Sequence, residues 1–93
     1  MKPNRDGNEI IRTIISEIEF SALRALSLYT AYISNINILS KDELTEMKFD
    51  YHYKRHQLDG QLLIAESLDI NTHGTLFRNL NALIKTEREY GII

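Results

Sequence analysis

The feature that most constrains the fold is a helix start in the middle of the chain. Ser40 is followed three residues later by Glu43, which is the spacing of a capping box. In this motif the serine hydroxyl accepts a hydrogen bond from the glutamate backbone N–H, and the glutamate carboxylate accepts one from the serine N–H. Leu39 and Leu44 flank the box at the spacing of a hydrophobic staple. A helix therefore begins at the box, and any helix before it must end.

The segment before the box has the pattern of one long amphipathic helix. An apolar residue recurs at every third or fourth position over about seven turns. The apolar face comprises Ile11, Ile15, Ile18, Ala22, Ala25, Tyr29, Tyr32 and Ile36. We expect a helix over about residues 7–36, preceded by a flexible tail over residues 1–6. The short connection over residues 37–40 predicts that the next helix runs antiparallel to the first.

The segment after the box predicts a helix over about residues 41–68 with two apolar faces. The face expected against the first helix comprises Leu44, Met47, Tyr51, Arg55, Leu58, Leu62 and Ala65. We expect the Arg55 guanidinium to extend to the edge of this face or to a carboxylate such as Glu17 or Glu19. The second face comprises Phe49, Tyr53, His56, Gly60, Leu63 and Ile64. A glycine inside a helix suggests that another segment passes close to this second face at Gly60.

A third, shorter helix is expected over about residues 76–90, after a loop and with Thr72 or Thr75 as its cap. The simplest closure folds it back over Gly60, Leu63 and Ile64, and Gly91 is placed to end it. The fold class is therefore all-α, a long antiparallel helical hairpin plus a shorter third helix. It forms a three-helix bundle, or a four-helix-type bundle on dimerisation. The 93 residues fit a single helical domain.

Composition excludes several classes of protein. The chain has no cysteine, which rules out a disulfide scaffold and a thiolate metal site. A formal net charge of −2 gives no general attraction to nucleic acid or to an anionic membrane. The polar N-terminus is unlike a signal peptide, and no long uncharged apolar run predicts a membrane span. We expect a cytoplasmic protein, and the frequent Ile, Asn and Lys are typical of AT-rich bacterial or phage genomes.

Two histidines in the second helix have a spacing that metal sites use. His52 and His56 are four residues apart, and Asp59 lies on the same edge of the helix. Lys48 and Arg55 crowd that edge and would oppose a cation. The sequence leaves metal binding there open, and we expect no metal and no other cofactor.

The same edge suggests nucleic-acid binding as an alternative function. Its basic side chains alternate with aromatic residues that can stack on bases, and they are Lys48, His52, Lys54 and Arg55. Acidic residues dilute this charge, because residues 36–70 carry four basic and seven acidic side chains. Nucleic acid is therefore a possible partner that the sequence does not favour.

Catalysis is not expected, because the chain has no cysteine nucleophile, no Gly-x-Ser-x-Gly turn and no phosphate-binding glycine loop. The main functional signal is apolar surface that the fold does not use. Phe20 and Leu23 project from the back of the first helix. On the back of the second helix the corresponding residues are Phe49, Tyr53 and His56. Patches centred on aromatic side chains are typical of protein interfaces. We expect a small regulatory protein that forms a homodimer and binds another protein.

Overall fold

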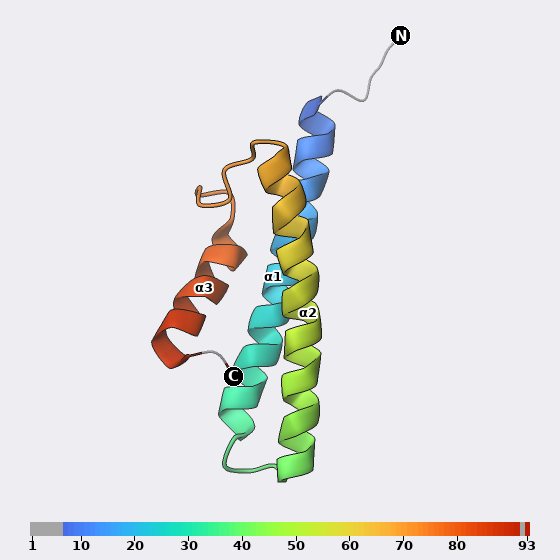
Figure 1. Ribbon diagram of the computed structural model, residues 1–93. Coiled ribbons are helices and arrows are strands. Elements are labelled where there is room, and N and C mark those ends of the chain that lie inside the picture. Colours follow the sequence, from blue (N-terminus) through green and yellow to red (C-terminus); the bar gives the residue numbers. More distant parts are fainter. Residues whose placement is uncertain (1–6, 92) are drawn as a thin grey trace.

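The computed structural model describes residues 7–91 and 93, and within them it contains three α-helices (Figure 1). These are α1 (Gly7–Asn35), α2 (Lys41–Ser67) and α3 (Arg78–Tyr90). The all-α fold is confirmed, with α1 and α2 forming a long antiparallel hairpin. The helices expected over 7–36, 41–68 and 76–90 differ from these bounds by one or two residues. The tail expected over residues 1–6 lies outside the described residues.

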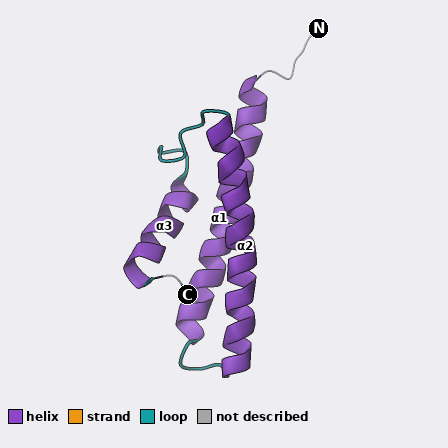
Figure 2. Cartoon of the chain, viewed as in Figure 1, coloured by secondary structure: helices purple, strands orange, loops and turns teal. Residues whose placement is uncertain are grey.

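The capping box at the start of α2 forms as the sequence predicts. The Glu43 backbone N–H donates to the Ser40 hydroxyl at 3.2 Å, and the Ser40 N–H donates to the Glu43 carboxylate at 3.0 Å. These hydrogen bonds lower the pKa of Glu43, the backbone one most strongly. Five residues before the cap, the Asn35 carbonyl closes α1 by accepting from the Leu39 N–H at 3.0 Å. The hairpin therefore reverses within the short teal turn of Figure 2.

The core lies along α1, because α1 packs against both other helices. All three helices and the residue before α3 supply its fully buried apolar side chains, which are Ile18, Ala22, Ala25, Tyr29, Tyr51, Leu58, Ala65, Phe77, Leu80 and Leu83. The small Ala22 and Ala25 let the helix axes approach closely. Tyr29 and Tyr51 pack edge to face, with ring centroids 5.4 Å apart. These aromatic rings fill the interior where the three helices meet.

The N-terminus of α3 is capped by a side chain from another helix. Neither expected cap, Thr72 nor Thr75, serves, and Phe77 at the cap position makes no capping hydrogen bond through its side chain. Instead the Glu19 carboxylate of α1 accepts hydrogen bonds at 3.0 Å from two backbone N–H groups of the first turn, those of Asn79 and Leu80. A carboxylate at a helix N-terminus also interacts favourably with the helix dipole. Glu19 thus fixes where α3 begins and ties it to α1.

The expected position of α3 over Gly60 is wrong. In Figure 1, α3 (red) lies along α1, and the orange loop carries it away from the outer side of α2. Leu63 and Ile64 remain 66% and 55% exposed. A Cβ built on Gly60 would meet no atom within 4 Å. The reason is that Glu19 holds the start of α3 against α1, so the helix cannot reach the far side of α2.

Candidate functional site

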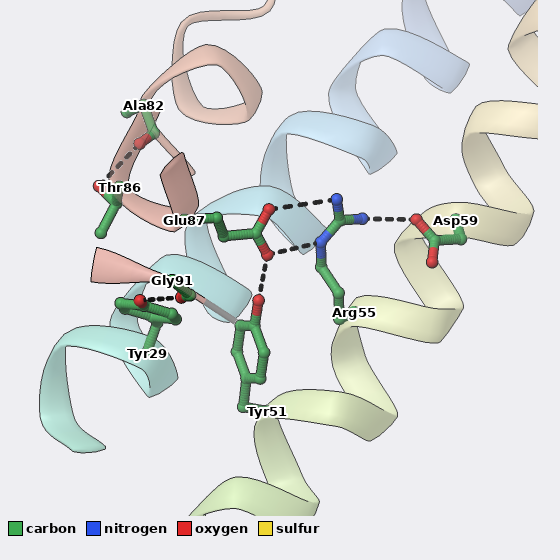
Figure 3. A network of polar contacts seen from close by, with 8 residues as sticks. All are labelled: Tyr29, Tyr51, Arg55, Asp59, Ala82, Thr86, Glu87 and Gly91. Carbon is green, nitrogen blue, oxygen red and sulfur yellow. Dashed lines mark hydrogen bonds and ion pairs between the residues drawn. The ribbon is translucent and has the colours of Figure 1, made fainter. Parts of the chain in front are cut away.

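Glu87 of α3 is the centre of a polar network that joins α3 to α2 (Figure 3). Its carboxylate accepts a hydrogen bond from the Tyr51 hydroxyl and two from the Arg55 guanidinium, through Nε at 2.8 Å and Nη2 at 3.3 Å. The Arg55 Nη1 also donates to Asp59 at 2.5 Å. Beside it the Tyr29 hydroxyl donates to the Gly91 carbonyl. Arg55 therefore pairs with Glu87 and Asp59, and the expected pairing with a glutamate of α1 is wrong.

This network acts as a clamp on the C-terminal end of α3. Burial of the Tyr51 phenol, its hydrogen bond to Glu87 and the nearby carboxylate charge raise its pKa. The polar groups of the clamp are hydrogen-bonded to one another. Glu87 accepts from Tyr51 and Arg55, and Arg55 also donates to Asp59. The arrangement connects α2 to the C-terminal part of α3 and stabilises the helix packing.

The basic edge proposed for nucleic acid does not assemble on one surface. Arg55 points toward α3, where both ends of its guanidinium are bound to carboxylates. Lys54, the residue before Arg55, is turned by about 100° around the helix relative to it. Its ammonium donates to Gln57 at 2.6 Å, and its side chain lines a groove beside α1. Lys48 and His52 are half-buried and lie on the same line of α2 as Arg55, so Lys54 is the one of the four residues that projects to another side.

The histidine pair does not gather further metal ligands. The His52 and His56 rings lie 6.5 Å apart, and the Asp59 carboxylate is turned to Arg55. Across residues 7–91 and 93, no three His, Cys, Asp or Glu side chains lie closely enough to hold a metal ion.

An open groove lies between α1 and α2 in the described surface. It has a volume of about 450 Å³, and none of its lining residues comes from α3. From α1 it is lined by Ser16, Glu17, Phe20 and Ser21, and from α2 by Lys54, Gln57 and Gln61. Phe20 is 63% exposed, so an aromatic ring stands free at one wall of the groove. The opposite side of α1 is the one that carries α3, through Glu19.

Helical periodicity adds three apolar side chains to the border of this groove. Tyr53 precedes Gln57 by four residues, and Ile64 follows it by seven, so both lie on the groove side of α2. Ile10 lies seven residues before Glu17 on α1. We call the groove and its border the open face; its exposed apolar residues are Ile10, Phe20, Tyr53 and Ile64. Each of them is between 51% and 69% exposed.

The structure thus reassigns the five residues predicted to bind a partner. Phe20 and Tyr53, expected on two separate patches, border the same groove. Leu23, 45% exposed, follows Phe20 by three residues and Glu19 by four, so it lies between the groove side and the α3 side of α1. Phe49, 69% exposed, and His56 project from the outer side of α2. Ile64 belonged to the second apolar face of α2 in the sequence, whereas Ile10 had no sequence signal beyond its helical spacing.

Comparison with protein-family models, curated proteins and solved structures gives no significant match. Within the described residues, none of the helices combines the length and the apolar composition needed to cross a bilayer.

Proposed function

We propose that this chain is a small, non-catalytic regulatory or adaptor protein that acts by binding protein through the open face. One observation carries the proposal. The third helix packs along the other side of α1, so the hairpin keeps a groove with exposed aromatic residues at its border. Contiguous apolar surface rimmed by polar side chains is characteristic of protein interaction sites.

The chemistry of the open face supports protein as its ligand. Phe20 and Tyr53 supply large, rigid side chains of the kind that act as interface anchors. Around them Glu17, Lys54 and Gln57 form a polar rim. An interface of this kind excludes water at its centre and forms hydrogen bonds at its edge. The nucleic-acid alternative has less support, because the Arg55 guanidinium is already bound by two carboxylates.

The proposal is tested by placing a charge on the open face. Phe20→Glu and Tyr53→Glu are compared with Leu76→Glu, which alters an equally exposed side chain in the loop before α3. Association is measured for the purified chain with itself by sedimentation. Association with other proteins is measured by quantitative affinity capture, followed by titration of each purified captured protein. Circular dichroism monitors helicity.

We expect both open-face variants to lose an association that the wild-type chain and Leu76→Glu retain, with unchanged helicity. Because the contact is mainly apolar, the association should change little between low and high salt, unlike a phosphate-dependent one. The proposal fails if no association of the wild-type chain depends on Phe20 or Tyr53. It also fails if these variants unfold the chain, because the two side chains would then belong to the core.

A further inference from the structure

We infer that the occupant of the open face is a second copy of this chain, packed antiparallel across a two-fold axis beside Phe20. The inference rests on the proposed function, since it uses the open face as an interaction surface. It adds the identity of the partner and the register in which the two copies meet.

The charged residues on either side of Phe20 are complementary to the same residues of a second copy that runs in the opposite direction. Glu17 lies three residues before Phe20 and Arg24 lies four residues after it, so the two charges stand on the same side of α1, about 10 Å apart. Both are exposed, and neither forms an ion pair within the described residues. A two-fold axis crossing α1 between them places Glu17 of each copy opposite Arg24 of the other. An interface between identical surfaces requires this kind of self-complementarity.

The same axis crosses α2 between two polar residues of the groove. Gln57 lines the groove together with Phe20, so the axis crosses α2 close to Gln57. Lys54 and Gln61 lie on either side of that point, and an antiparallel copy brings each opposite the other. The Lys54 ammonium of one copy therefore meets an uncharged side chain of the other, and no cation lies opposite it.

A parallel arrangement of the two copies is electrostatically worse. There, α1 of one copy lies over α2 of the other at the same height. Across the hairpin, Phe20 lies beside Gln57 and Tyr29 packs on Tyr51. Arg24 lies between Phe20 and Tyr29 on α1, and Lys54 lies between Tyr51 and Gln57 on α2. Arg24 and Lys54 are therefore level, and the parallel packing would bring two cations together. The antiparallel packing pairs Arg24 with a carboxylate instead.

The open face is large enough for a stable dimer. Helices of 27 and 29 residues are each about 40 Å long, and two of them side by side present a face about 20 Å wide. That face offers on the order of 800 Å² per copy, which is the area that specific interfaces bury on each partner. The product is a four-helix arrangement of α1 and α2 from both copies, with each α3 on the outside.

The test is a charge-reversal series on the full 93-residue chain, with the dimer dissociation constant measured by sedimentation equilibrium. Glu17→Arg and Arg24→Glu each turn two attractive contacts into repulsive ones. We expect each to weaken the dimer about tenfold or more, and the double variant to recover to within about threefold. The matched reversals Glu89→Arg and Lys85→Glu on α3 change the net charge identically, and we expect them to leave the constant within about threefold.

The outcomes separate this inference from the proposed function. A wild-type chain that stays monomeric at all concentrations overturns the second copy as occupant, while Phe20-dependent capture of another protein would still support the function. A dimer that ignores the single reversals, or that the double variant fails to restore, overturns the antiparallel register. A dimer that is unaffected by Phe20→Glu does not use the open face and overturns the inference; it contradicts the proposed function as well if no captured protein depends on Phe20 or Tyr53.

Discussion

Arg55 of α2 and Glu87 of α3 form an ion pair, 2.8 Å between Nε and Oε2, that joins the two helices packed on either side of α1. The pair is largely shielded from solvent, with side-chain exposures of 22% and 13%. Together with Glu19 at the other end of α3, it holds the third helix at both of its ends. This double attachment directs α3 to one side of the hairpin and leaves the open face on the other.

Glu87→Gln should therefore destabilise the fold. The amide keeps the shape but loses the charge that faces Arg55, and it leaves one hydrogen bond of the network unmade. We expect a loss of about 2 kcal/mol in the free energy of unfolding. Urea denaturation measures it, with Glu89→Gln on the exposed side of the same helix as the control. Equal stabilities of the two variants would contradict the clamp.

The Tyr51 phenol should make stability fall at high pH. Its pKa is raised from 10.0 in the folded chain, chiefly by burial and then by Glu87. Below pH 10 the phenol is neutral in both states, so the full contribution is present. As pH rises above 10, the unfolded chain loses this proton while the folded chain keeps it, and stability declines.

Tyr51→Phe should make this decline shallower between pH 10 and pH 11 in denaturant titrations. Tyr53→Phe changes an exposed ring and serves as the control. A decline that is identical in the wild-type chain and in Tyr51→Phe would show that the buried phenol does not contribute to it.

Glu19→Ala should loosen the start of α3 without disturbing α1. The backbone N–H groups of Asn79 and Leu80 lose their acceptor, and loss of a side-chain cap costs about 1 kcal/mol. Hydrogen exchange should accelerate at these two amides and in the first turn of α3. Glu17→Ala, two residues earlier on the same helix, is the control. Unchanged exchange at Leu80 would be incompatible with the cap from α1.

Gly60→Ala should stabilise the protein, by about 0.5–1 kcal/mol. The position is inside α2, where alanine is favoured over glycine, and the added methyl group meets no atom within 4 Å. The thermal midpoint should therefore rise. A destabilised variant would mean that another segment does cover this side of α2, as the sequence alone had suggested.

The hairpin was predictable from the sequence because its signals are local. The Ser40–Glu43 box, the apolar spacing before it and Gly91 at the end of α3 depend on residues within one or two turns. The exposure of Phe20 also followed from its position on the polar side of its helix, and that of Tyr53 from its position on the face of its helix that lies away from the first helix.

The placement of α3 was not predictable in this way, because it depends on pairs far apart in the chain. Glu19 contacts Leu80 across 61 residues, and Arg55 contacts Glu87 across 32. From the sequence, any of several carboxylates could pair with the Arg55 guanidinium. The packing of α3 along α1 is what brings Glu87, rather than another carboxylate, next to it. The sequence therefore showed that the apolar side chains were unused, but not that Phe20 and Tyr53 border one groove.

The central claim is that the open face is an interaction surface, and the most direct measurement is the solution mass by light scattering across a dilution series. The account predicts twice the 10.8 kDa chain mass for the wild-type protein and a monomer for Phe20→Glu, with unchanged helicity. Equal masses for the two proteins at every concentration, together with no Phe20-dependent partner in the capture experiment, would contradict it.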